Sequence, residues 1–296
     1  MNAEAALARD PAALVAEIED RGRRVETPCG DGTMAWRIWG SDTGRTPVVL
    51  GHGAQGAWSH WIHNIDALVA SGRLVIAADL PGHGDSADPE TPDHPGISAV
   101  LAEGLREILG EGRQVDLVGF SFGGVAFSYF ASYHPEFVRR LIIVGCGGLD
   151  TPQGHVTLQR VGGLEGEERR AALKSNLLGL MLHHPESADD LAMHLLVRNA
   201  KRSAVKPQEL VLPDRLALVL PDVALPVDAI WGELDQPHPD PHLQEEVIRR
   251  THPDADFRVI QDAGHWAMYE RPDAFNATLL AMLDTNPDTG AEELPC

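Results

Sequence analysis

Cysteine is scarce in this chain of 296 residues, which holds only Cys29, Cys146 and Cys296. The three are odd in number, lie far apart and form none of the closely spaced pairs typical of metal or redox sites. Their scarcity excludes a disulfide-stapled secreted scaffold. It predicts free thiols in a reducing compartment, with the cytoplasm as the default location.

Basic residues are also few, since 24 Lys and Arg stand against 44 Asp and Glu and give a formal net charge of -20. A field of this sign repels phosphate backbones and anionic lipid headgroups, so we predict neither a nucleic-acid nor a membrane partner. Residues 1–20 are acidic and lack a long apolar run, so we expect neither a signal peptide nor a membrane span there. We therefore predict a small-molecule substrate as the partner. A homo-oligomer is compatible with this composition.

Short apolar strands alternate with helical segments through much of the chain. This alternation predicts a mostly parallel sheet that is buried on both faces and flanked by helices, which is an α/β fold. The strands are predicted at residues 47–50, 74–78, 115–118, 141–144, 227–231 and 257–260, with helices at 58–70, 97–109 and 122–134.

Two regions depart from the alternation. Residues 5–23 have an amphipathic helical pattern broken at Pro11, and a hairpin is predicted to turn at residues 30–32, between strands at 24–26 and 34–39. Residues 150–222 show helical periodicity without convincing strands, for example at 167–181 and 189–197. We therefore predict a core made of 1–149 and 223–296, with 150–222 as a helical cap over the strand ends.

A serine lies between glycines where the apolar run at 115–118 meets a helical pattern. The segment Gly119-Phe120-Ser121-Phe122-Gly123 has the form G-x-S-x-G, typical of a nucleophile on a tight strand-to-helix turn. The glycines remove side chains that would collide in such a turn, and the helix start directs N–H groups toward negative charge beside the serine. Ser121 is therefore a candidate nucleophile, although an ordinary turn serine has a similar pattern.

A serine nucleophile needs a base and an acid that orients the base. Asp235 follows the predicted strand at 227–231, and His265 follows the strand at 257–260. Ser121, Asp235 and His265 thus occur in the order nucleophile, acid, base, each after a strand, which is the order of hydrolases built on an α/β sheet. Glu233 competes with Asp235 for the role of acid, because it lies on the same loop.

These motifs resemble the α/β-hydrolase superfamily over roughly residues 25–285. The segments 48–54 and 79–86 are similar to two of its strand-end loops, and 264–266 with Glu270 and 275–276 is similar to its esterases and carbon-carbon bond hydrolases. The resemblance implies a fold with a Ser121, Asp235 and His265 triad. It also implies an oxyanion hole made by the backbone N–H groups of Ala54 and Phe122, with no cofactor and no metal.

Two alternatives of other classes stay open. Residues 51–56 match G-x-G-x-x-G after a strand, and Asp79 could be a ribose-binding acid, which favours a dinucleotide-binding enzyme. Asp79 lies further along the chain than the ~20 residues preferred by that fingerprint. A non-catalytic receptor on the hydrolase fold is the other alternative.

Two hydrolase activities stay open, which differ in their substrate. One is a carboxylic-ester hydrolase, and the other is a carbon-carbon bond hydrolase of aromatic ring-cleavage products. Arg198 is a candidate clamp for a substrate carboxylate, or a solvated helix residue, and Trp266 is a candidate substrate contact or a packing residue. His52 and His83 are predicted to fix loops. The pairs His183-His184 and His238 with His242 have no metal-binding spacing and no neighbouring ligands in the sequence.

Overall fold

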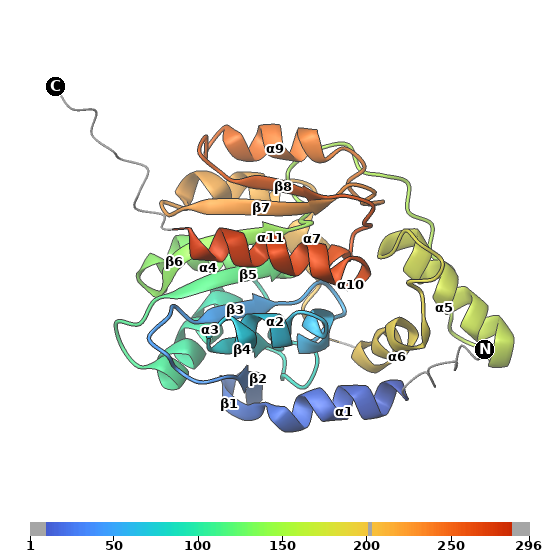
Figure 1. Ribbon diagram of the computed structural model, residues 1–296, viewed down its shortest axis with the longest axis horizontal. Coiled ribbons are helices and arrows are strands. Elements are labelled where there is room, and N and C mark those ends of the chain that lie inside the picture. The colour runs from blue at the N-terminus through green and yellow to red at the C-terminus, as the bar shows by residue number, and fades with distance from the viewer. Residues whose placement is uncertain (1–9, 201–202, 286–296) are drawn as a thin grey trace, which may run out of the picture.

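The computed structural model describes residues 10–200 and 203–285. Its eight strands form one sheet in the order β1-β2-β4-β3-β5-β6-β7-β8, with helices on both sides (Figure 1). The first two pairings, β1 with β2 and β2 with β4, are antiparallel, and the remaining pairings are parallel. The predicted α/β-hydrolase fold class is confirmed. The strands are β1 (Arg23–Cys29), β2 (Gly32–Trp39), β3 (Val48–Gly51), β4 (Val75–Ala78), β5 (Val115–Phe120), β6 (Val138–Val144), β7 (Val227–Gly232) and β8 (Phe257–Ile260).

The central strands are short and apolar because both of their faces are covered. Every residue of β3, β4, β5 and β7 is buried. Such strands lack the alternation of polar and apolar residues seen where one face meets water. The hairpin of β1 and β2 turns at Gly30, whose φ of +51° favours glycine.

Helices α3 (His94–Leu109) and α4 (Phe122–Tyr133) contribute to one hydrophobic cluster, with Trp36 of β2. Helices α2 (Ile65–Ala70) and α11 (Pro272–Asp284) contribute to another, with Trp39. Because neighbouring side chains alternate across a strand, the two buried tryptophan positions mark different layers of the core. Outside the segment between β6 and β7, the other helices are α1 (Pro11–Arg21), α9 (Pro241–Arg249) and α10 (Ala267–Glu270), with 3-10 turns η1 (Trp58–Trp61) and η2 (Pro135–Phe137).

Between β6 and β7, the described residues form helices and no strand. Met181, just after the first of these helices, accepts a hydrogen bond at 2.7 Å from the Trp266 N–H, beyond the end of β8. This segment therefore packs against the edge of the sheet at which the predicted functional loops emerge (Figure 1). Its helices are α5 (Gly166–Leu180), α6 (Asp190–Asn199), α7 (Pro207–Val211), α8 (Arg215–Val219) and the 3-10 turn η3 (Leu220–Asp222).

Two predicted helices differ in the structure. Pro11 begins α1 instead of breaking it, because a proline at the first helical position loses no hydrogen bond and the Asp10 side chain caps the Ala12 N–H at 3.3 Å. Residues 5–9 of that prediction lie outside the described part. The single helix predicted over 58–70 is wrong, since it divides into η1 and α2. Within residues 10–200 and 203–285, no helix combines the length and apolar character needed to cross a membrane.

Candidate active site

Ser121 occupies the sharp turn between β5 and α4, with φ +50° and ψ -118°. Side chains rarely tolerate this backbone conformation, which persists only where the surroundings hold it. A Cβ added to Gly119 would lie 2.5 Å from the Cα of Gly124, and one added to Gly123 would lie 2.6 Å from the His52 carbonyl oxygen. Both glycines are therefore sterically required for the turn.

The start of α4 offers backbone donors beside this serine. The Ser121 N–H is already used, because it donates to the Val144 carbonyl at 2.8 Å. The N–H of Phe122 lies at the first position of α4, where helices leave N–H groups without partners inside the helix. Ala54 faces the same space from a tight turn, closed by a 3.1 Å hydrogen bond from the Gly56 N–H to the Gly53 carbonyl.

His265 and Asp235 meet although they are 30 residues apart. The His265 Nδ1 lies 2.8 Å from Asp235 Oδ2, and both side chains are buried. Burial by itself would raise the pKa of Asp235, but attraction to the His265 and His238 imidazoles outweighs it and holds that pKa well below its usual range. Asp235 is therefore an anion able to keep the His265 ring in one orientation.

Glu233, the competing acid, points elsewhere. Its Oε2 accepts a hydrogen bond from the Asp262 N–H at 2.9 Å, and the residue is exposed. The structure thus brings Asp235, and not Glu233, to His265. Gly145 permits this approach, since a Cβ there would lie 3.3 Å from both Asp235 Oδ2 and His265 Nδ1.

One cavity of about 610 Å³ joins the predicted residues. Ser121, His265, Ala54 and Phe122 all line it, so the structure gathers the candidate nucleophile, the candidate base and both oxyanion-hole candidates around one space. None of the described lining residues is Lys or Arg. Most of the remaining wall is apolar and includes Phe120, Val156, Leu158, Leu180, Met181, Val211 and Leu212.

The two tentative substrate contacts do not line this cavity. Arg198, near the end of α6, pairs with Glu19 of α1 at 2.6 Å and borders a separate, smaller hollow. The Trp266 side chain is buried, donates to the His60 carbonyl at 2.9 Å and stacks on Tyr269. These contacts favour the alternatives for both residues, a helix-surface role for Arg198 and a packing role for Trp266.

Three histidines act on the loops around the serine. His52 accepts from the Leu80 N–H at 2.9 Å, and its Nδ1 lies 2.7 Å from the Gly53 carbonyl, so it fixes two loops as expected. His83 Nδ1 lies 3.1 Å from the Pro81 carbonyl. His60, which no sequence motif indicated, has an Nδ1 that accepts from the Gly53 N–H at 3.3 Å. Burial lowers the pKa of His60 to about 3, which keeps the ring neutral.

His238 is the second missed residue. It lies three positions after Asp235, and its backbone N–H donates to Asp235 Oδ1 at 2.9 Å. The side chain is buried and lines the cavity. The expectation that His238 lacks neighbouring ligand side chains is wrong, because Asp235 and His265 both lie beside it. The only available sequence signal was its spacing from Asp235.

The structure also explains the glycines at 51–56 without a dinucleotide. A Cβ on Gly51 would lie 2.7 Å from the Phe127 ring, and one on Gly56 would lie 2.4 Å from the His60 ring. Both carboxylate oxygens of Asp79 are occupied by backbone N–H groups, at 2.7 Å from Trp58 and 2.9 Å from Asp85. These contacts favour a loop-fixing role for Asp79 over ribose binding.

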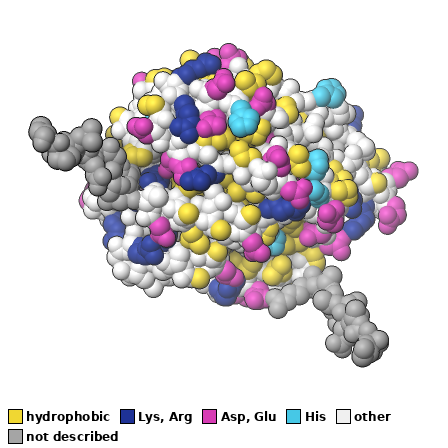
Figure 2. All heavy atoms as spheres, turned by 45° about the horizontal axis from the view of Figure 1, so that its top comes forward, with side chains coloured by type: hydrophobic (Ala, Val, Ile, Leu, Met, Phe, Trp, Pro, Cys, Tyr) yellow, Lys and Arg dark blue, Asp and Glu magenta, His cyan; other side chains and the backbone are white. Residues whose placement is uncertain are grey.

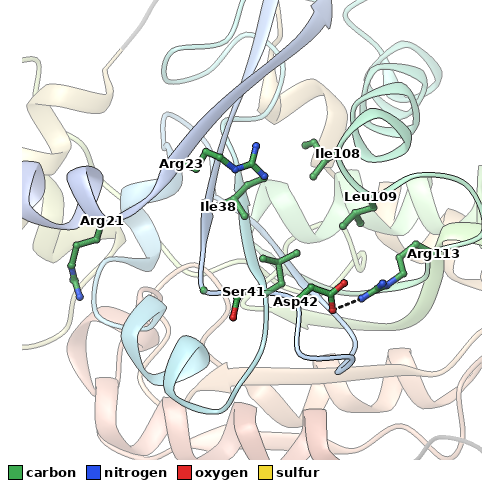
Figure 3. A pocket seen from close by; sticks show the side chains of 10 residues that line it. Arg21, Arg23, Ile38, Ser41, Asp42, Ile108, Leu109 and Arg113 are labelled. Carbon is green, nitrogen blue, oxygen red and sulfur yellow. Dashed lines mark hydrogen bonds and ion pairs between the residues drawn. The ribbon is translucent and has the colours of Figure 1, made fainter.

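A second cavity, of about 520 Å³, contains three arginines but no triad residue (Figure 3). Arg113 pairs with Asp42 at 2.8 Å and Arg21 pairs with Asp66 at 2.9 Å, so two of the three cations are already neutralised. The described cysteines, Cys29 and Cys146, are buried thiols outside any disulfide, and Cys29 Sγ donates to the Ala87 carbonyl at 3.3 Å, while Cys296 lies outside the described residues.

Comparison with known proteins agrees with this geometry. The profile of the alpha/beta hydrolase family matches residues 48–278. A 2-hydroxy-6-oxononadienedioate/2-hydroxy-6-oxononatrienedioate hydrolase from a Pseudomonas species is 29% identical over 254 residues, covering 80% of this chain and 87% of that protein. Its counterpart from Burkholderia vietnamiensis is 30% identical over 263 residues, covering 81% and 88%.

Among solved structures, naproxen esterase from Bacillus subtilis superposes with a TM-score of 0.73 at 19% identity, covering 93% of this chain and 97% of that one. At this level of identity, the structural similarity supports a shared fold and nothing more specific. The chain belongs to the alpha/beta hydrolase family. The enzyme class expected from its sequence is thereby confirmed as that of a hydrolase.

Proposed function

We propose that this protein is a serine hydrolase that cleaves a small carboxylic ester through an acyl-enzyme. The observation that carries the proposal is the convergence of Ser121 and the hydrogen-bonded Asp235–His265 pair on one cavity. No metal or organic cofactor takes part in this mechanism. The cavity's volume of about 610 Å³ falls in the range of small-molecule sites, ~300–1,000 Å³.

In the first half of the reaction, Ser121 Oγ attacks the ester carbonyl carbon and its proton passes to His265 Nε2. Asp235 holds the Nδ1–H of the ring and stabilises the imidazolium that forms. The N–H groups of Ala54 and Phe122 donate to the oxyanion, and one such donor typically contributes about 3 kcal/mol to lowering the barrier. The carbon-oxygen bond then breaks, and His265 returns the proton to the departing alcohol.

Water completes the cycle. It transfers a proton to His265 as its oxygen attacks the acyl carbon, and collapse of the second intermediate restores the Ser121 hydroxyl and releases the acid.

Replacing Ser121 with alanine should leave the fold intact and lower turnover by about 10⁶-fold. Full activity in the Ser121→Ala variant, measured beside its circular dichroism, would disprove the assignment.

A carbon-carbon bond hydrolase is the second candidate, and the names of the relatives favour it. Those relatives act on dioates, which carry two carboxylate groups. The ester is preferred because the described lining of the cavity offers no Lys or Arg to pair with a carboxylate. Burying such a charge without a partner is costly, whereas an apolar acyl group gains from the apolar wall.

Two assays separate the candidates. Hydrolysis of p-nitrophenyl esters is compared with cleavage of a vinylogous diketo acid, at matched concentrations and with the Ser121→Ala variant as the blank. We expect a higher kcat/KM for the neutral ester, and a preference for the acid would reverse this order.

A fluorophosphonate probe tests the receptor alternative, because a stoichiometric adduct on Ser121 requires an activated serine. Binding of NADH without that adduct would favour the dinucleotide alternative.

A further inference from the structure

The proposed ester hydrolysis does not use the His238 side chain, yet this ring lies at the centre of the site. His238 lines the cavity and is only 6% exposed. Its Nδ1 lies 3.3 Å from Asp235 Oδ1, in contact with this carboxylate but without regular hydrogen-bond geometry. A buried ring nitrogen held this loosely by its partner needs an explanation, because such atoms are normally well satisfied.

Three potential ligand atoms converge at this point. Asp235, His238 and His265 each offer one, and all three atoms lie within 4.8 Å of one another. Two imidazoles and one carboxylate form a donor set typical of catalytic zinc. A tetrahedral ion with bonds of about 2.0–2.1 Å holds its donors ~3.4 Å apart, so only small side-chain shifts are required here.

Two of the three donor residues, His238 and His265, line the cavity, while Asp235 does not. Both rings turn their Nδ1 atoms toward Asp235, one to each carboxylate oxygen. The ion would therefore have three protein ligands and would lie between the two rings and the carboxylate, next to the cavity.

We propose that Asp235, His238 and His265 bind a divalent transition-metal ion, with Zn²⁺ as its representative, and that the bound ion switches the hydrolase off. The switch rests on the proposed function, because it acts on the catalytic base. A neutral His265 ring carries one proton, held on Nδ1 by Asp235 in the active state. A metal on Nδ1 moves that proton to Nε2, and a protonated Nε2 cannot accept the proton of Ser121. No bond to carbon changes and no electron is transferred.

Calorimetric titration of Zn²⁺ into the Ser121→Ala variant tests binding without any need for turnover. We expect one saturable site per chain, weakened about 100-fold when His238→Gln is added, since even an outer-shell ligand partner contributes 10–100-fold. His242→Gln is the matched control, because His242 lies four residues further along, in the first turn of α9, with an 83% exposed side chain; it should leave the affinity unchanged. Equal binding with and without His238, or no binding at all, overturns the proposal.

His265→Gln in the Ser121→Ala background removes a second ligand and keeps the test decisive if the His238 variant fails to fold. It should weaken Zn²⁺ binding by a similar factor, and unchanged binding by a folded variant overturns the proposed site. The active enzyme should lose ester hydrolysis in Zn²⁺ and recover it with EDTA. An active esterase that binds no Zn²⁺ contradicts only the metal site, whereas Zn²⁺ binding by an inactive chain contradicts only the proposed function.

Discussion

At the scale of single residues, the proposed function depends on which carboxylate reaches His265. Asp235 and Glu233 share one short loop, but Asp235 lies behind the imidazole and Glu233 turns outward to the Asp262 N–H. The β7 strand ends at Gly232, so the direction of the chain after this residue decides which side chain reaches His265. Sequence spacing placed both acids on the loop and could not orient them.

Asp235→Asn should lower kcat/KM for the ester by about 10⁴-fold, because an amide stabilises neither the correct His265 tautomer nor the imidazolium. Initial rates over a substrate series measure this loss. Glu233→Gln is the matched control and should retain activity within about threefold of the wild type, since surface changes usually have small effects. A large loss in the Glu233 variant with a small loss in the Asp235 variant would exchange their roles.

Gly123→Ala should destabilise the protein by about 1–3 kcal/mol, because its Cβ would collide with backbone atoms that have no room to move. The added atom would lie 2.6 Å from the His52 carbonyl oxygen and 2.7 Å from Gly51. Urea unfolding gives the difference. Gly162→Ala, where nothing lies within 4 Å of the added Cβ, should change stability little. Equal stabilities of the two variants would contradict the close approach at the elbow.

At the scale of elements, the site depends on how the loop after β8 is tied to the segment after α5. The Glu270 carboxylate, at the end of α10, accepts from the Gly264 N–H at 2.6 Å and from the N–H groups of His183 and His184 at 3.0 and 2.7 Å. One side chain thus joins three stretches of chain beside His265. This explains the position of Glu270 downstream of the Gly264-His265-Trp266 motif.

Glu270→Ala should destabilise the fold by about 1–3 kcal/mol, because that is the cost of leaving the buried Gly264 N–H without an acceptor, and the partly buried N–H groups of His183 and His184 lose theirs as well. Turnover should fall as well, since Gly264 positions its neighbour His265. Glu270→Gln keeps one acceptor oxygen and should lie between the wild type and the alanine variant in thermal unfolding and in kcat. If all three proteins unfold alike, the carboxylate does not hold these elements together.

Strand and helix order was largely predictable, and helix interruptions were not. The 58–70 pattern is continuous, yet η1 and α2 separate around Asn64, whose side chain donates to the Met268 carbonyl at 3.1 Å and to the Asn276 side chain at 2.8 Å. Both partners lie over 200 positions away in the sequence. Helix propensity depends on residues that are near in the sequence, so it cannot predict these contacts. The interruption of the helix at Asn64 therefore follows from tertiary packing.

At the scale of the whole molecule, a net charge of -20 coexists with many local ion pairs. Acidic and basic side chains are interspersed across the face shown in Figure 2, with hydrophobic side chains between them. Two buried histidines, His94 and His60, contribute differently, because burial disfavours their charged form. Burial lowers the pKa of His94 to about 4 and that of His60 to about 3. Between these values and the ordinary pKa, the unfolded chain binds protons that the folded protein does not.

The free energy of unfolding should therefore decrease as the pH falls from 7 through 6.5 toward 4, because the unfolded chain takes up a proton at His94 and the folded protein does not. His94→Phe removes this titration while keeping a ring to stack on Tyr129, whose centroid lies 3.6 Å from that of His94. The unfolding free energy of the variant relative to the wild type should rise by on the order of 1 kcal/mol between pH 7 and pH 5. Urea unfolding at both pH values measures it, and a pH-independent difference would contradict a lowered pKa.

The sequence by itself determined the alternation of strands and helices, the strained serine turn and the order of Ser121, Asp235 and His265, because glycine spacing and apolar runs act locally. Only the tertiary structure decided that Asp235 outcompetes Glu233, that Arg198 pairs with Glu19 away from the cavity, and that His238 joins Asp235 and His265. These outcomes depend on the directions of loops and helix ends. Such directions are set by packing between segments far apart in the chain, which no local pattern records.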